Sequence, residues 1–141
     1  MIRIDYPKYN FRFQKQDEKE LIFDEIRKRW VRLTPEEWVR QNLIQYLIQI
    51  KKYPASLLSV EKEIKLNDLK KRCDIVVFKN TEPWMIIECK ADDVNLTEQT
   101  VQQILAYNIT LKSRYLVITN GLNTYCLDTL KQAFFKELPE Y

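Results

Sequence analysis

Residues 73–89 read CDIVVFKNTEPWMIIEC and contain two nearly continuous apolar runs, 73–78 and 84–89. Strands that are apolar on both faces lie in the middle of a sheet that is covered on both sides. The polar connection between the two runs is only five residues long, which is typical of adjacent antiparallel strands. We therefore predict a hairpin at the centre of a sheet, with other elements packed on both of its faces.

The segment 34–51 predicts one covering helix. It begins Thr34-Pro35-Glu36-Glu37, where threonine is a good N-cap, proline suits the first helical position and a glutamate follows the cap by three residues. Apolar residues recur at helical spacing and form one stripe, made of Val39, Leu43, Tyr46, Leu47 and Ile50. Glu36 falls on this stripe and Glu37 outside it, so we expect Glu36 to face inward and Glu37 to cap the helix end.

The other patterns complete an α-β-β-β-α-β-β-α order from residue 34 onward. We predict strands at 58–66, 114–119 and 123–127, a helix from about Leu96 to Leu111 capped by Asn95 or Thr97, and a short helix at 128–135. The fold class is therefore α/β of the α+β kind, with a mixed sheet flanked by helices in a single domain. That domain comprises an N-terminal region of two or three short strands or an extended arm (1–33), a core (34–128) and a C-terminal helix and tail (129–141). Residues 27–33 fit either a strand or a helix.

Composition restricts the chemistry. The 141 residues contain no histidine, one glycine (Gly121) and three cysteines that are far apart in sequence. These counts exclude nucleophile–histidine pairs, the common zinc sites and Gly-rich phosphate loops. The net charge of +3 is too small to indicate nucleic-acid binding by itself. We expect no membrane span, and the unpaired cysteines without an export signal predict a cytoplasmic protein.

Three charged side chains gather at one end of the predicted hairpin. If the turn centres on Thr81, Asp74 lies opposite Glu88, and period-two alternation places Asp74, Glu88 and Lys90 on one face. Two opposed carboxylates repel unless a cation lies between them, and their oxygens suit Mg²⁺ or Mn²⁺. We therefore expect a metal site at Asp74 and Glu88, with Lys90 orienting or deprotonating a water molecule. Glu36 is a candidate third carboxylate, assisting a second ion or the water.

Each of these residues also has an ordinary structural explanation. Asp74 suits the start of a strand, while Glu88 and Lys90 suit a surface ion pair. Glu36 suits a solvated helix end, where an acidic side chain is favoured by the helix dipole. The sequence alone leaves both interpretations open.

Two further groups of polar residues also have both a functional and an ordinary structural interpretation. Gln103 and Tyr107 lie four residues apart on the second helix, either as part of an exposed flank or with Gln103 close to Lys90 or a phosphate. Basic residues near the hairpin form either a solvated turn or contacts to backbone phosphates: Lys65, Lys70, Lys71 and Arg72.

Five stretches together resemble the PD-(D/E)xK nuclease superfamily, and more closely the N-terminal nuclease domain of type I restriction enzyme R subunits. They are 35–41, 71–77, 84–91, 103–107 and 115–121. The resemblance implies an α-β-β-β-α-β core in which Asp74, Glu88 and the backbone carbonyl of Cys89 bind a divalent metal ion and Lys90 is the catalytic lysine. It also matches Gln103 and Tyr107 to the Q-x-x-x-Y motif of the family, and Glu36 and Arg40 to a helix glutamate followed four residues later by arginine. Cys73 replaces the usual proline before Asp74.

The resemblance implies a Mg²⁺-dependent DNA endonuclease-like domain, with Mn²⁺ as a substitute, in a restriction, defence or DNA-processing context. DNA would be held mainly through its backbone, and a homodimer or a partner subunit would supply targeting. The alternative is a non-catalytic DNA-binding or protein-interaction module on a nuclease fold. R subunits continue into an ATP-driven translocase motor that these 141 residues do not contain, so we do not expect ATP-dependent restriction by this chain alone.

Overall fold

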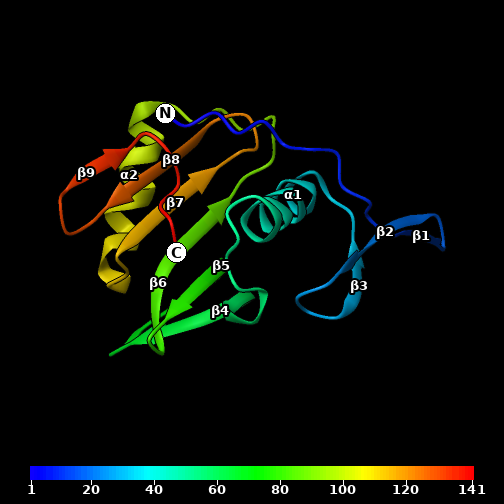
Figure 1. Ribbon diagram of the computed structural model, residues 1–141, viewed down its shortest axis with the longest axis horizontal. Coiled ribbons are helices and arrows are strands. Elements are labelled where there is room, and N and C mark those ends of the chain that lie inside the picture. Colours follow the sequence, from blue (N-terminus) through cyan, green and yellow to red (C-terminus); the bar gives the residue numbers. More distant parts are fainter.

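The computed structural model describes residues 1–141 and contains two sheets and two helices (Figure 1). The smaller sheet has three antiparallel strands: β1 (Phe13–Gln16), β2 (Lys19–Asp24) and β3 (Arg29–Arg32). The larger sheet is mixed and has six strands: β4 (Leu58–Leu66), β5 (Leu69–Lys79), β6 (Glu82–Cys89), β7 (Tyr115–Thr119), β8 (Thr124–Asp128) and β9 (Ala133–Phe135). The helices are α1 (Pro35–Gln49) and α2 (Glu98–Asn108), and short 3₁₀ turns lie at Ala55–Leu57 and Ile109–Leu111. Neither helix has the length and hydrophobicity that a transmembrane helix requires.

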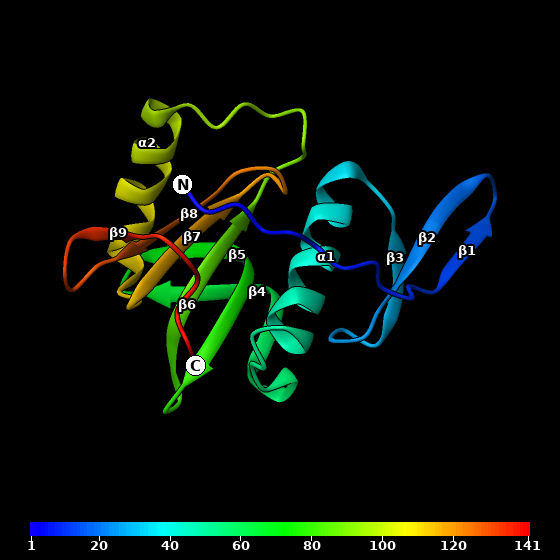
Figure 2. The same ribbon diagram turned by 45° about the horizontal axis from the view of Figure 1, so that its top comes forward.

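The predicted central hairpin is confirmed. β5 and β6 pair antiparallel inside the strand order β4-β5-β6-β7-β8-β9, and β6 pairs parallel with β7. α1 covers one face of this sheet and α2 covers the other, so each face has its own apolar core (Figure 2). Ile75 and Ile87 belong to the core on the α1 side, whereas Val76 and Ile86 belong to the core on the α2 side. The continuous apolar runs follow from this burial on both faces.

The hairpin register is close to the predicted one. Val76 lies opposite Ile86 as expected, but a bulge between Val77 and Phe78 shifts the register toward the turn. The strands are joined by Asn80 and Thr81, which both have a left-handed backbone conformation (φ 53° and 66°). A two-residue turn of this kind pairs Lys79 with Glu82, and the bulge accommodates the extra residue.

The predicted cap Thr34 is confirmed, and of the two caps considered for the second helix the structure uses Thr97, so that α2 begins at Glu98, two residues later than expected. Both threonines accept hydrogen bonds from the backbone N–H groups three residues later. The N-terminal region forms three strands, and residues 29–32 adopt the strand alternative. The predicted helix at 128–135 is wrong, because the chain turns after β8 and returns as β9. The carboxylate of Asp128 accepts the N–H groups of Leu130 and Lys131, which stabilises a tight turn in place of a helix.

Candidate functional site

Asp74 lies on β5 and is held by two donors. Its Oδ2 accepts the backbone N–H of Cys89 at 2.7 Å, and its Oδ1 accepts Nη1 of Arg40 at 3.0 Å. Burial nevertheless raises the pKa of Asp74 to about 6, although the Cys89 N–H and Arg40 act in the opposite direction. Glu36 and Glu88 add smaller repulsive contributions. Burial therefore disfavours the ionised form of this carboxylate.

Glu88 and Lys90 lie at the end of β6, and they form the ion pair that their ordinary structural explanation anticipates. Nζ of Lys90 is 3.6 Å from Oε2 of Glu88, and the lysine side chain is about one-third exposed (37%). The backbone N–H of Lys90 donates to the carbonyl of Thr119 on β7, which holds the residue beside the sheet. This pair therefore offers a carboxylate and a solvent-accessible ammonium group side by side.

A second lysine also binds Glu88. Nζ of Lys71 is 2.9 Å from Oε1 of Glu88 and 2.5 Å from Oδ1 of Asn108, and it lies 4.8 Å from the ring centroid of Tyr107. Lys71 was expected only at a solvated turn or a DNA backbone contact, and Asn108 carries no signal in the sequence because its contact depends on how α2 packs. The structure thus neutralises Glu88 with two ammonium groups.

The two carboxylates have different partners. Asp74 is held by Arg40 of α1, whereas Glu88 is held through Lys71 together with Asn108 of α2. The paired part of the hairpin ends at Ile75 opposite Ile87, one residue short of the predicted Asp74–Glu88 pair. No group of three or more acidic, cysteine or histidine side chains is arranged to hold a metal ion.

The two glutamates of the first turn of α1 show the reverse of the expected burial. Glu36 is exposed and makes no side-chain hydrogen bond, so the prediction that it faces inward is wrong. Glu37 is 5% exposed and accepts hydrogen bonds from Arg27, Arg40 and Gln41. Burial by itself raises the pKa of Glu37, but these donors outweigh it and lower the pKa to about 2. The arginine of the predicted glutamate–arginine pair therefore binds Glu37, three residues earlier.

Glu37 belongs to a chain of ion pairs that joins the two sheets, which we call the arginine network. Asp24, which is fully buried, binds Arg27 at 2.7 Å; Arg27 and Arg40 bind Glu37 at 2.9 Å and 2.7 Å; and Arg40 binds Asp74. A further carboxylate, Glu61 of β4, lies 2.6 Å from Nη1 of Arg40. The network connects the three-stranded sheet to the candidate site.

Gln103 and Tyr107 lie on the exposed side of α2. Tyr107 contacts Lys71 through its ring, and Gln103 makes no side-chain hydrogen bond. The predicted proximity of Gln103 to Lys90 is therefore not a contact in this structure. A direct part in the chemistry for either residue would need a contact with a bound substrate.

Comparison with known proteins gives one match. Residues 35–140 match the family described as "Type I restriction enzyme R protein N terminus (HSDR_N)". No curated protein and no solved structure matches the chain significantly. The family match includes α1, α2 and the whole six-stranded sheet, whereas β1, β2 and β3 lie outside it.

Proposed function

The chain belongs to the family of type I restriction enzyme R protein N termini, and from this premise we propose that it hydrolyses DNA phosphodiester bonds with a divalent cation. The observation that carries the proposal is the grouping of Asp74, Glu88 and Lys90 at the end of the central hairpin. Family membership supports a restriction context with other subunits. We extend the proposal to a cytoplasmic location and to targeting by a partner subunit or a second copy of the chain.

The donor set at this end of the sheet fits Mg²⁺ or Mn²⁺. Asp74, Glu88 and the backbone carbonyl of Cys89 offer only oxygen atoms, and Mg²⁺ commonly uses one or two carboxylates while keeping several waters. The raised pKa of Asp74, caused mainly by burial, indicates a carboxylate that additional positive charge would stabilise. When bound, such an ion polarises the phosphate and lowers the pKa of a water ligand.

The residues of the chain have separate tasks in this proposal. The ammonium group of Lys90 orients the attacking water and stabilises negative charge at phosphorus, because it is exposed enough to reach a bound strand. Arg40 holds Asp74 in place, and Lys71 holds Glu88. Glu36, whose charge is felt at Asp74, remains a candidate third carboxylate, and Gln103 and Tyr107 remain candidates for phosphate or lysine contacts.

One observation favours the alternative, a DNA-binding module without catalysis. Each carboxylate already has a cationic partner, Arg40 for Asp74 and Lys71 for Glu88. These partners must share or release carboxylate oxygens before a metal ion can bind.

A DNA-cleavage assay separates the two functions. Supercoiled plasmid and linear DNA are incubated with the protein in Mg²⁺, Mn²⁺ or EDTA. We expect cutting only with the metal ions, and a loss of about 100-fold in rate in Lys90→Ala and in Asp74→Asn. Lys112→Ala and Asp68→Asn, which change exposed residues whose side chains make no hydrogen bond or ion pair, serve as matched controls. Undiminished cutting in the site variants would contradict the proposed site, and binding without cutting would favour the alternative.

A further inference from the structure

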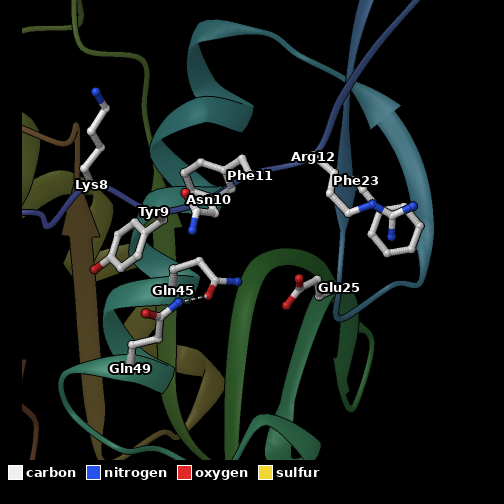
Figure 3. Close-up of a pocket in the computed structure, with 9 residues that line it drawn as sticks. All are labelled: Lys8, Tyr9, Asn10, Phe11, Arg12, Phe23, Glu25, Gln45 and Gln49. Atoms are coloured by element: carbon white, nitrogen blue, oxygen red, sulfur yellow. Dashed lines mark hydrogen bonds between the residues drawn. The ribbon is translucent and has the colours of Figure 1, made fainter.

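A cleft of about 210 Å³ lies between the N-terminal segment, β2 and the C-terminal half of α1 (Figure 3). The residues on which its chemistry depends are Tyr9, Asn10, Arg12, Phe23, Gln45 and Gln49. We call it the N-terminal cleft. None of the candidate site residues lines it, and four of these six residues lie before the part of the chain that matches the family. The cleft is therefore built mostly from residues outside the family match.

Amide groups with unused hydrogen-bonding capacity line the α1 side of the cleft. Oε1 of Gln45 accepts Nε2 of Gln49 at 2.6 Å, and Nε2 of Gln45 donates to no other protein group. Asn10, on the facing segment, makes no side-chain hydrogen bond either (Figure 3). Asparagine and glutamine amides present a donor and an acceptor together, which matches the edges of nucleobases.

The opposite side of the cleft carries a flat cationic and aromatic surface. The guanidinium carbon of Arg12 lies 4.4 Å from the ring centroid of Phe23 and 5.4 Å from that of Trp30. Guanidinium planes and aromatic rings are the groups on which unpaired bases stack.

The charge distribution favours a phosphate-bearing ligand. Residues 1–33 contain nine basic and six acidic residues, whereas residues 34–141 contain fourteen of each. The whole net positive charge thus belongs to the segment that builds the N-terminal cleft. At the cleft itself Lys8 and Arg12 outnumber Glu25, and Figure 3 shows Lys8 extending outward from the rim.

We propose that the N-terminal cleft binds an unpaired nucleobase of a nucleic-acid strand. The guanidinium plane of Arg12, backed by the ring of Phe23, provides the stacking surface, the amides of Gln45 and Asn10 bond the base edge, and Lys8 lies near the adjoining phosphates. A paired base cannot present its face and its hydrogen-bonding edge together, so the cleft selects single-stranded over duplex DNA. This binding stands independently of cleavage at Asp74 and Lys90.

Fluorescence anisotropy with the full-length Lys90→Ala protein in EDTA tests this, because no strand can be cut under these conditions. The probe is a labelled oligo(dT) of about 20 nucleotides, longer than the few nucleotides one such site contacts. We expect it to bind about tenfold more tightly than a duplex of the same length, and Arg12→Ala and Gln45→Leu each to weaken it about tenfold. Lys112→Ala, on the far side of the six-stranded sheet, should change the affinity less than about twofold.

Arg12→Lys distinguishes stacking from charge, since it retains the positive charge and removes the guanidinium plane. We expect it to weaken binding nearly as much as Arg12→Ala, and thermal unfolding of each variant confirms that the fold is intact. Equal effects of Arg12→Ala and Lys112→Ala, or equal affinity for the duplex, would overturn the proposal. Thymidine monophosphate that binds as tightly as oligo(dT) would also overturn it by assigning the cleft to free nucleotides. Failure here leaves the cleavage assay of the unmodified protein unaffected, so the two proposals fail separately.

Discussion

The central hairpin and the three-stranded sheet approach α1 from opposite sides and are attached to it in different ways (Figure 2). The hairpin packs fully buried apolar side chains against the helix, including Ile75 and Ile87. In β1, β2 and β3, Ile22 is the only buried apolar side chain. The ring of Phe13 in β1 packs against Trp38 of α1, and the buried part of the attachment is made by Asp24 and the arginine network.

This difference predicts different sensitivities. Apolar contacts do not depend on direction or on ionisation, so the hairpin should tolerate changes of pH and small shifts in position. Buried ion pairs depend on both, and removal of one partner leaves the others buried and unpaired. Because Arg40 binds both Glu37 and Asp74, a disturbance of the three-stranded sheet should also reach the candidate site.

Replacement of Glu37 should have the largest effect, and it tests directly whether the arginine network holds the three-stranded sheet. Glu37→Leu leaves Arg27 and Arg40 without their shared carboxylate, so we expect a loss of about 3–5 kcal/mol in the free energy of unfolding. Glu36→Leu, one residue earlier and exposed, should change it by less than about 0.5 kcal/mol. Urea denaturation of both variants measures the difference. Equal effects would mean that the arginine network does not hold the sheet.

Ile87→Ala makes the corresponding test in the hairpin. Ile87 is fully buried, and removal of its side chain should cost about 2–5 kcal/mol through lost burial and the cavity left behind. Leu130→Ala, which alters a side chain that is 75% exposed, is the control and should be nearly neutral. Unlike the effect of Glu37→Leu, the loss should be the same at pH 4 and pH 7. A strong pH dependence for Ile87→Ala would contradict the distinction between the two regions.

The same distinction explains how much could be predicted from the sequence. The hairpin, both covering helices and their caps follow from local apolar patterns and capping residues, and these elements are where we expected them. The prediction for Glu36 failed because the apolar stripe was treated as the only buried side of α1. The helix is also covered by the three-stranded sheet, so its polar stripe of Glu37, Gln41 and Gln45 is buried as well. The repeat of polar residues every fourth position was the available signal.

The contacts of the candidate site were predictable only where they are local. Lys90 directly follows β6, two residues after Glu88, and the ion pair between these two side chains is present. The pairs of Asp74 with Arg40 and of Glu88 with Lys71 join residues that are 34 and 17 positions apart, and no local pattern encodes them. The helix predicted at 128–135 failed for a different reason: Asp128 accepts hydrogen bonds from the backbone of Leu130 and Lys131, which closes a turn, and it also binds Arg114, 14 positions earlier.

Acid titration sharpens the comparison further. The pKa of Glu37 falls from 4.5 to about 2 in the folded protein, so its ionised form stabilises the fold above pH 4.5. This contribution, up to about 3 kcal/mol, is lost as the pH falls from 4.5 toward 2. We expect urea denaturation to show that loss in the wild-type protein and a much shallower one in Glu37→Leu. Parallel pH profiles would show that other carboxylates dominate the acid response.

The smallest expected effect concerns Mg²⁺, which should act at the hairpin and not at the three-stranded sheet. An ion that binds only the folded protein stabilises it by about 1.4 kcal/mol at ten times its dissociation constant, which raises the melting temperature by a few degrees. We expect this rise in the wild-type protein and in Asp68→Asn. We expect it to be lost in Asp74→Asn, because Asp74 belongs to the proposed donor set and Asp68 does not. Sodium chloride at the same ionic strength controls for screening of the arginine network, and EDTA should reverse the effect. A rise of equal size in Asp74→Asn would place the binding elsewhere and remove the main support for a metal ion between Asp74 and Glu88.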